Sequence, residues 1–445
     1  MCFARLHRGP HMHDGRSRGR VVLSEGAEAL ARAFLAGEWT EAGLLARGSA
    51  VFDRRPRRLR RIVRAVLELY HRPPLDRPRE LARIIDTLAP LPAVRNWIAF
   101  EPSMGRTPWP VPSIPTLADL ADFFEADIGK LQWLADAHQL ERLVASEQLR
   151  NYRYSWHARP GSTPRLIERP KSHLKSLQRT VLRAILDHVP PHDAAHGFRR
   201  GRSAVTHAAL HTGRRAILRF DLENFFASVE GRRVFAIFRA AGYPESVSYA
   251  LTALCVNVVP RSEWAAAPRP EDPRLLDAHW RLGRRLSEPH LPQGAPTSPA
   301  LANLAALGLD RRLTGLAARF DATYGRYADD LALSGDERLL AAAPTIRAAV
   351  HEIARDEGFR VNARKSQLMT NAGRQRLCGV VVNVRPNVAR REYDTLKAIL
   401  HNAARRGPGE ETRDRLMGRI AWVESVNPSR GAKLRARFAE IDWAR

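Results

Sequence analysis

Three aspartates mark the part of the sequence where chemistry is most readily expected. Asp329 and Asp330 are adjacent and lie between two apolar stretches, and Asp221 ends an earlier apolar run. Adjacent carboxylates repel each other, so a divalent metal ion is the simplest compensation for such a pair in apolar surroundings. Carboxylates that hold two Mg²⁺ ions serve phosphoryl transfer, in which one ion activates the attacking hydroxyl and the other stabilises the leaving oxygen. A solvated turn with two acids is the alternative that a pair of aspartates leaves open.

Strands are expected to position these acids. Residues 216–222 are strongly apolar and predict a strand that ends in an acid, and residues 326–333 have the pattern of a hairpin with its acids at the turn. Apolar periodicity and turn residues predict the rest: helices over 25–39, 57–71, 78–88, 116–137, 171–188, 338–357 and 391–440, a hairpin over 151–170, strands over 359–361, 367–369 and 376–383, and an irregular insert over 260–290.

The chain divides by composition. Residues 1–20 lack periodicity and are predicted to be a disordered basic tail, and residues 21–100 form a helical N-terminal extension. Five prolines in residues 101–115 indicate a linker before the remaining chain, residues 116–445.

Charge points to a polyanionic partner. The 445 residues carry 72 Lys and Arg against 47 Asp and Glu, a formal net charge of +25. Coding bias explains most of the arginines. Only six cations are lysines, and an ammonium group, unlike a guanidinium, can give up a proton, so a lysine such as Lys365 is a candidate proton donor.

Several classes of protein are excluded or disfavoured. No apolar run approaches the roughly 18 residues of a membrane span, and the first twenty residues lack the apolar core of a signal peptide. The three cysteines are Cys2, Cys255 and Cys378, and they form no CxxC pair, so a disulfide framework and a zinc ribbon are poorly supported. We therefore expect a cytoplasmic protein with no membrane partner.

Three motifs resemble, in order, the palm motifs of reverse transcriptases: FDLENFF at 220–226, LPQGAPTSPALAN at 291–303 and YADD at 327–330. The resemblance implies an RNA-directed DNA polymerase with an α+β right-hand fold, in which an antiparallel palm sheet bears the acids. Residues 116–383 would be the fingers and palm, and residues 384–445 a helical thumb. By the same resemblance Asp221, Asp329 and Asp330, with the main-chain carbonyl of Leu222, would hold two Mg²⁺ ions.

The resemblance also implies a nucleotide site. Phe226 matches the ring under the sugar, which leaves no room for a 2′-hydroxyl and favours deoxynucleotides; a core aromatic is the alternative. Gln293 and Gly294 begin the second motif, where the backbone approaches the incoming nucleotide. The segment RPGSTPRLIERPKSHLKSLQR at 159–179 looks like the fingers motif, so Arg165 and Arg159 would clamp the triphosphate, unless they belong to a generic basic surface.

Two further motifs follow the acids. Lys365, in NARKSQLM, is the candidate general acid for departing pyrophosphate, and a plain phosphate contact is the alternative. Residues 377–383, LCGVVVN, resemble the strand pair that grips the primer end, with Leu377, Cys378 and Gly379 at its start.

The retron branch of reverse transcriptases is the most similar one. QGAPTSP in the second motif, TLADLADFFEADIGKLQWLADA at 116–137 and HGFRRGRSAVTHAALH at 196–211 carry this resemblance. Retron enzymes have NAxxH before the first aspartate, where this chain has His207 to His211, so both histidines would serve RNA recognition although His207 replaces the Asn. Where retrons have VTG, this chain has Leu377-Cys378-Gly379, and only the glycine agrees.

A retron enzyme would copy part of its cognate noncoding RNA into branched, RNA-linked DNA (msDNA), primed from a guanosine 2′-hydroxyl, in anti-phage defence. Its partners would be that RNA, the RNA–DNA hybrid, deoxynucleoside triphosphates and an effector protein. Residues 412–423 and 430–437 are candidate duplex contacts. The arginine-rich segment 54–64 suggests accessory RNA binding, an effector contact or a merely stabilising extension. A solitary defence or group II intron-like enzyme without a branched product, and a catalytically idle RNA-binding scaffold, are the alternatives.

Overall fold

A computed structural model describes residues 23–52, 57–136, 139–144, 146–159, 161–407 and 409–443. The chain separates into two compact units, residues 1–104 and 105–445. Their boundary falls inside the proline-rich segment 101–115, which the sequence indicates as a linker. The tail proposed for residues 1–20 lies outside the described residues.

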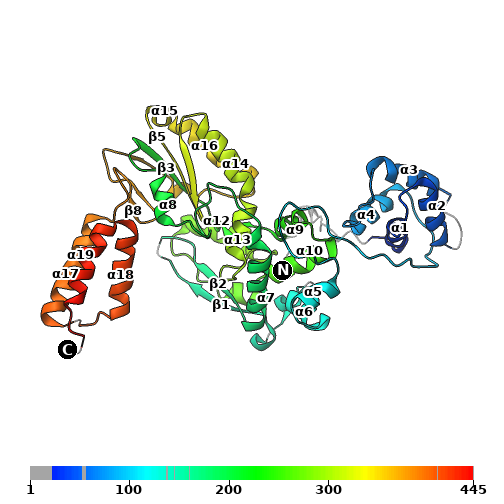
Figure 1. The fold of residues 1–445 in the computed structure, drawn as a ribbon, viewed down its shortest axis with the longest axis horizontal. Coiled ribbons are helices and arrows are strands. Elements are labelled where there is room, and N and C mark those ends of the chain that lie inside the picture. Colours follow the sequence, from blue (N-terminus) through cyan, green and yellow to red (C-terminus); the bar gives the residue numbers. More distant parts are fainter. Residues whose placement is uncertain are drawn as a thin grey trace, which may run out of the picture. The chain divides into compact units, whose positions relative to one another are not determined.

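The described part of the first unit contains four helices (Figure 1): α1 (Glu25–Leu35), α2 (Glu41–Ala50), α3 (Leu59–Leu69) and α4 (Pro78–Leu88). Ser24 caps α1, as its position in the sequence suggests, and α1 packs on α4 around buried Leu30 and Phe34. The prediction of one helix over 25–39 is wrong in its extent. The chain leaves α1 after Leu35, and a separate helix, α2, begins after the cap residue Thr40.

The second unit begins with helices and a small sheet. One helix was expected over 116–137, but α5 (Leu117–Phe123) and α6 (Ile128–Ala135) are separate, because Glu125 adopts a left-handed φ of 52° and Asp127 caps a new helix. The hairpin expected over 151–170 is confirmed, with β1 (Tyr152–His157) antiparallel to β2 (Arg165–Pro170). Helix α7 (Ser172–Ala184) follows.

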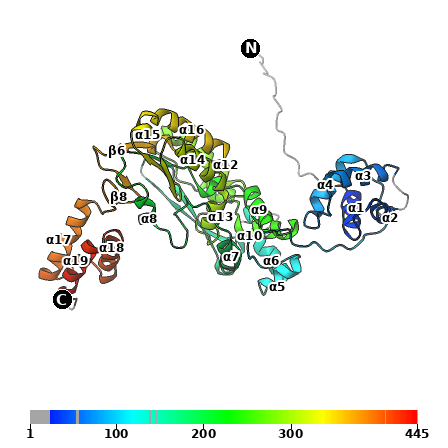
Figure 2. The same ribbon diagram turned by 45° about the horizontal axis from the view of Figure 1, so that its top comes forward.

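A four-stranded antiparallel sheet lies at the centre of the second unit. Its strands are β3 (Ala216–Asp221), β4 (Thr323–Tyr327), β5 (Asp330–Gly335) and β6 (Gln367–Thr370), in the order β4-β5-β3-β6. The expected strand and hairpin around the acids are therefore confirmed. Helix α14 (Leu307–Ala318) packs on β4 and on α16 (Ala343–Asp356), and the two helices lie side by side in both views (Figure 1; Figure 2).

The second unit contains further helices before its C-terminal part. They are α8 (Ala204–Ala209), α9 (Gly231–Ala240), α10 (Glu245–Cys255), α11 (Arg261–Ala265), α12 (Leu276–Leu286), α13 (Ser298–Ala305) and α15 (Glu337–Ala341), with short 3₁₀ turns at Leu140–Leu143, Glu147–Leu149, Leu186–His188, Phe226–Ser228, Pro273–Leu275 and Ala363–Lys365.

Three predictions about these elements need correction. The insert 260–290 is not irregular, because α12 buries Leu282 and Leu286 against Leu166 and Val259. The strand expected over 359–361 is only a single bridge between Leu222 and Val361. The helix expected over 338–357 is divided at Ala342 into α15 and α16.

The chain ends in a small hairpin and three helices. In place of one strand over 376–383, β7 (Arg376–Leu377) and β8 (Val380–Val381) pair across a two-residue turn. Helices α17 (Arg390–Arg406), α18 (Arg413–Val426) and α19 (Pro428–Ala439) then pack through Leu400, Ile420 and Leu434. The fold class is thus α+β with antiparallel sheets, as expected. Among the residues described, no helix combines the length and the apolar character that crossing a membrane requires.

Candidate active site

The fold brings the three aspartates to one edge of the central sheet. Asp221, the last residue of β3, lies directly across from Asp330, the first residue of β5. The amide of Leu222 donates a hydrogen bond to the carbonyl of Asp329 (2.9 Å), which ties the end of β3 to the β4–β5 turn. Ala328 in that turn has a positive φ of 57°, so the chain reverses within two residues and leaves Asp329 at the turn and Asp330 on the strand.

Two of these carboxylates are paired with cations of the chain. Lys365 Nζ lies 2.9 Å from Asp221 Oδ1 and 3.1 Å from Oδ2. Arg219 holds Asp330 Oδ1 through Nη2 (2.7 Å) and Nε (3.1 Å). The sequence analysis missed Arg219, although its position two residues before Asp221 places it on the same face of β3.

The surroundings of Asp329, in contrast, disfavour the charged form of its carboxyl group. Burial raises the pKa of its carboxyl, and the neighbouring charges of Asp221 and Asp330 raise it further. The residues described contain no closed cluster of three His, Cys, Asp or Glu side chains that would form a metal cage. Mg²⁺ does not require one, because it binds through one or two carboxylates together with waters and substrate phosphates. Hard carboxylate oxygens with a shortage of positive charge fit such an ion.

A pocket of about 470 Å³ opens in front of the acids. It collects most of the site residues expected from the sequence: Arg159, Arg165, Asp221, Leu222, Phe226, Gln293, Asp329 and Lys365. Three arginines that the sequence analysis did not select, Arg274, Arg281 and Arg364, also line it. Arg274 and Arg281 lie in the insert 260–290, which was expected to be irregular, and Arg364 precedes Lys365 in its motif. The pocket thus combines carboxylates with arginines and a lysine, as a metal–triphosphate complex would require.

Aromatic rings also line this pocket. Phe226 and Phe198 have ring centroids 5.8 Å apart, and both line the cavity. Phe198 has a φ of 59° and is 48% exposed, which is unusual for a large apolar side chain. Phe226 is partly exposed to the cavity, so it is not a core aromatic of the kind that was the alternative interpretation.

The Gln293–Gly294 turn packs against β2. Gly294 has a φ of 134°, and a Cβ there would lie 2.7 Å from the carbonyl oxygen of Glu168, so only glycine fits. The amide of Glu168 donates to the carbonyl of Gln293 (2.9 Å). The buried Glu168 carboxylate accepts hydrogen bonds from Asn257 Nδ2 (2.7 Å) and His290 (3.1 Å). Burial lowers the pKa of His290, but the charge of Glu168 and the hydrogen bonds to Glu168 and to the carbonyl of Glu288 together outweigh burial, so the net shift of this pKa is upward.

A buried polar network supports the aspartate turn from within. Arg326 of β4 is fully buried and binds Asp310 through Nε (2.8 Å) and Nη2 (2.7 Å). Its Nη1 donates to Asn303 Oδ1 (2.9 Å) and to the carbonyl of Ala328 (3.1 Å). Asn303 in turn donates to the carbonyl of Gly197 (2.8 Å). The sequence analysis did not find Asp310 and Arg326, since no local pattern shows that these distant residues meet.

His207 and His211 lie beneath the hairpin rather than on a surface. Both side chains are fully buried, their rings are 5.0 Å apart, and both are against Gly325 of β4. His211 Nδ1 is 2.7 Å from Ser334 Oγ of β5. Burial lowers the pKa of His207 to about 4, so the ring is neutral at physiological pH. Direct RNA contact by either side chain is inconsistent with this burial, and their contacts indicate a supporting role for the hairpin.

The segment expected to grip a primer forms the β7–β8 turn. Cys378 and Gly379 both have positive φ, 47° and 87°, as a tight two-residue hairpin turn requires. Leu377 is buried, and Cys378 Sγ lies 3.6 Å from His207 Nδ1. Burial raises the pKa of the Cys378 thiol to about 12, and the nearby Asp330 carboxylate contributes, so this turn lies close to the acids.

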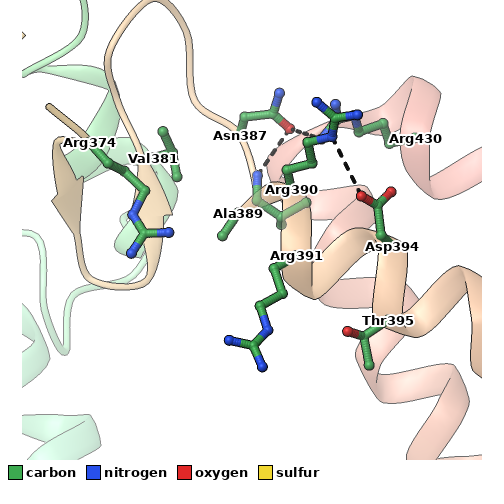
Figure 3. A pocket seen from close by; sticks show the side chains of 10 residues that line it. Arg374, Val381, Asn387, Ala389, Arg390, Arg391, Asp394, Thr395 and Arg430 are labelled. Carbon is green, nitrogen blue, oxygen red and sulfur yellow. Dashed lines mark hydrogen bonds and ion pairs between the residues drawn. The ribbon is translucent and has the colours of Figure 1, made fainter. Parts of the chain in front are cut away.

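A second, basic pocket of about 710 Å³ lies between this hairpin and the first turn of α17 (Figure 3). Arg390 pairs with Asp394 (3.6 Å), and Arg430 donates to Asn387 Oδ1 (3.1 Å). Arg374 and Arg391 line opposite sides of the pocket and have no ion pair or hydrogen bond with any residue that the structure describes. Of the helical segments expected to contact a duplex, 430–437 reaches this pocket through Arg430.

Sequence comparisons define the class of this protein. Residues 158–398, more than half of the chain, match the model of the family described as reverse transcriptase (RNA-dependent DNA polymerase). The chain therefore belongs to the reverse transcriptase family.

Within that family the chain is of the retron type. It is 40% identical to Retron Mx65 reverse transcriptase of Myxococcus xanthus over 61% of each chain. It is 34% identical to Retron Mx162 reverse transcriptase of the same organism, over 73% of this chain and 66% of the relative. Retron Ec86 reverse transcriptase of Escherichia coli is 31% identical over 55% of this chain and 66% of its own. The chain thus spans less than two thirds of the length of these relatives.

Proposed function

We propose that this chain is an RNA-directed DNA polymerase whose active centre consists of Asp221, Asp329 and Asp330. The observation that carries the proposal is the direct cross-strand pairing of Asp221 with Asp330, with Asp329 in the connecting turn, beside a pocket that Asp221 and Asp329 line together with several arginines. We further propose that the central sheet is the palm, that β1–β2 belongs to the fingers, and that α17–α19 form the thumb.

The three carboxylates, with the main-chain carbonyl of Leu222, would hold two Mg²⁺ ions. The donor set consists of hard oxygens, and the raised pKa of Asp329 reflects uncompensated negative charge that a divalent cation relieves. When bound, the ions supply activation of the primer hydroxyl and stabilisation of the departing pyrophosphate.

The remaining pocket residues would bind the incoming deoxynucleotide. Arg159 and Arg165 present guanidinium groups that match phosphate oxygens. The Phe226 ring would lie under the sugar and exclude a 2′-hydroxyl. The rigid Gln293–Gly294 turn, held against Glu168, would bring backbone to the nucleotide. These roles order the substrate before any bond is made.

Lys365 would hold the proton that the departing pyrophosphate receives. Its Nζ is within hydrogen-bond distance of Asp221 and it lines the same pocket as Arg165, so it lies between the acids and the expected triphosphate position. An ammonium group can act in this way because, unlike a guanidinium group, it can give up a proton.

The β7–β8 turn and the basic pocket beside α17 would hold the primer–template duplex. Leu377, Cys378 and Gly379 lie next to the acids, where a primer end is required. Arg374 and Arg391 offer unpaired guanidinium groups to phosphates of the duplex, and Arg430 adds a third.

The product would be that of a retron. The relatives named above are retron reverse transcriptases, which supports copying of a cognate noncoding RNA into branched, RNA-linked DNA, primed from a guanosine 2′-hydroxyl, in anti-phage defence with an effector protein. A solitary defence or group II intron-like enzyme without a branched product is the second candidate. A catalytically idle RNA-binding scaffold is the third, and the intact acids and Phe226 disfavour it.

Nucleic acid that copurifies with the protein tests this proposal. DNA that still carries a branched ribonucleotide after RNase treatment is the expected result, and purely unbranched DNA would support the solitary enzyme instead. Substitution of both Asp329 and Asp330 by Asn should abolish the DNA and leave RNA bound. Biological activity that survives this double substitution would support the scaffold.

A further inference from the structure

Helix α3 of the first unit has two sharply different faces. Leu59, Ile62, Val63 and Val66, at helical spacing, are at most 1% exposed and belong to the core of this unit. The opposite stripe, in the turn before α3 and along its first half, consists of exposed arginines: Arg57, Arg58, Arg60, Arg61 and Arg64. No acidic residue interrupts this arginine face between residues 57 and 67.

Most of these arginines have no partner in the protein. Arg64 pairs with Glu41 (3.3 Å). The side chains of Arg57, Arg58, Arg60 and Arg61 make no ion pair, hydrogen bond or ring contact with any described residue. Other arginines of the same unit are engaged, for example Arg47, which caps the end of α1 through the carbonyls of Ala33 and Phe34, and Arg77, which pairs with Asp76 and Glu80.

The placement of the arginine face is unfavourable for the helix itself. Helix N-termini are stabilised by acids and destabilised by cations. The other three helices of the unit follow this rule, with Glu25 and Glu28 in α1, Glu41 in α2 and Glu80 in α4. Helix α3 has no acid in its first turn and no side-chain cap, and arginines surround its start. Residues that oppose the stability of their own helix are expected at functional sites, so the arginines at the start of α3 indicate a binding site.

We propose that the arginine face of α3 binds the phosphate backbone of RNA. Guanidinium groups bind phosphate oxygens through paired hydrogen bonds, and a row of them matches a repeating polyanion. A protein partner would require apolar or aromatic anchors. The exposed large apolar residues described in this unit are only Leu69, at the far end of α3, and Trp97, which Arg32 covers at 5.4 Å.

This inference deepens the proposed function and rests on it for the identity of the polyanion as the RNA that the enzyme copies. The arginine face lies in residues 1–104, outside the segment 158–398 that matches the reverse transcriptase family model. It would therefore be a second attachment point, which raises the effective concentration of RNA at the active site without taking part in the chemistry.

Binding of a labelled RNA stem-loop to the full chain at several salt concentrations tests the proposal. The test variant replaces Arg57, Arg58, Arg60 and Arg61 by Gln, and the matched control replaces Arg72, Arg77, Arg79 and Arg83, on and before α4, by Gln. We expect the test variant to bind about 10-fold or more weakly, with a salt slope shallower by about 3, since each lost phosphate contact removes roughly 0.7 to 0.9 of a unit. The control should retain most of the affinity.

Two further measurements keep the result interpretable. Lysine in place of the same four arginines should restore most of the salt slope, because the charge remains. All variants should extend a short primer–template at the same rate as the wild type. If the wild type fails to extend it, the polymerase proposal is overturned, but the RNA-binding role of α3 is not. Equal losses of RNA affinity in the test and control variants, or unchanged affinity in the test variant, would overturn the RNA-binding role of α3.

Discussion

The acidic centre is compensated one residue at a time. Asp221 holds Lys365, Asp330 holds Arg219, and the raised pKa of Asp329 leaves that carboxylate with the least compensation. The two cations offset the repulsion between the carboxylates, which would otherwise destabilise the fold. The site is therefore electrostatically prepared for additional positive charge next to Asp329.

Substitution of Lys365 separates proton donation from charge. Lys365→Arg keeps the positive charge but has no proton to give near neutral pH, so we expect the rate of single-nucleotide incorporation to fall about 100-fold or more. Lys365→Gln should fall at least as far. Near wild-type incorporation by the Arg variant, with loss in the Gln variant, would show that Lys365 is only a phosphate contact.

Among the single residues of the site, those that lie in motifs can be predicted from the sequence, whereas those that are brought together only by the fold cannot. The three aspartates and Phe226 were predicted because they occur in recognisable strings. The fold places Asp221, Asp329 and Phe226 in one pocket, with Asp330 across from Asp221 in the sheet. Glu168, Asp310 and Arg219 were missed because their partners are set by strand register and helix packing. His207 was selected by its place in a motif, and only the fold shows that it is buried.

The elements around the hairpin determine how accurately it is held. Gly197 passes so close to the aspartate turn that a Cβ there would lie 2.5 Å from the backbone nitrogen of Ala328. The atoms nearest to that Cβ all belong to the backbone of the aspartate turn. Asn303 donates a hydrogen bond to the carbonyl of Gly197 (2.8 Å) and so holds Gly197 in place. The turn therefore has little freedom to move away.

Gly197→Ala should push the aspartate turn out of position. We expect a loss of about 1 to 3 kcal/mol in stability from overpacking and a fall in activity of about 100-fold, since small misplacements of reacting groups are costly. Gly315→Ala is the control, because nothing lies within 4 Å of a Cβ at that position in α14. It should be slightly more stable and fully active. Wild-type activity in Gly197→Ala, measured beside chemical denaturation, would refute the close fit.

The buried histidines under the hairpin should make stability depend on pH. Burial lowers the pKa of His207 from 6.5 to about 4, so between these values the unfolded chain binds more protons. The contribution of His207 to the free energy of unfolding is therefore complete above about pH 6.5 and decreases as the pH drops toward 4. At pH 5 the free energy of unfolding is lower by about 2 kcal/mol because of this residue.

Urea unfolding between pH 4.5 and 8 measures this effect, because this range covers most of the interval between the two pKa values, about 4 and 6.5, and the plateau above it. The variant His207→Gln has no imidazole to titrate and should show a weaker dependence on pH than the wild type. His173→Gln, at an exposed position of α7, should retain the full dependence. An unchanged slope in His207→Gln would contradict the assignment.

Element prediction succeeded where hydrophobic pattern and local geometry agree. Strand β3 and the β4–β5 hairpin were predicted correctly because long apolar runs flank polar turn residues. The segment 116–137 failed because one left-handed residue, Glu125, interrupts an otherwise continuous helical pattern. The insert 260–290 failed because its prolines and charges hide α12, whose apolar face is satisfied only by distant residues such as Leu166.

For the whole molecule, the excess positive charge becomes a set of separate basic surfaces. One surrounds the pocket in front of the acids, one lies beside α17, and one is the arginine face of α3. The sequence predicts a polyanionic partner from the net charge, but not these locations. Arginines that are distant in sequence, such as Arg374 and Arg430, line the same pocket only because of the fold (Figure 3).

The pocket beside α17 should contribute to duplex affinity in a salt-dependent way. Replacement of Arg374 and Arg391 by Gln should weaken binding of an RNA–DNA duplex for every sequence and make the salt slope shallower by about 2. Replacement of Arg338 and Arg355, exposed arginines paired with Asp321 and Glu352, is the control and should change the slope little. Equal slopes for all three proteins in a binding titration would contradict a role of this pocket in duplex binding.

The most direct measurement of the central claim is DNA synthesis on an RNA template with an annealed primer, deoxynucleoside triphosphates and Mg²⁺. The wild type and Asp321→Asn, a substitution of an exposed acid, should extend the primer, and chelation of Mg²⁺ should stop both. Asp329→Asn should be slower by at least about 100-fold, the upper range for residues that only support a metal ligand, and should still bind RNA. Absence of synthesis by the wild type, or equal synthesis by Asp329→Asn, would contradict the account.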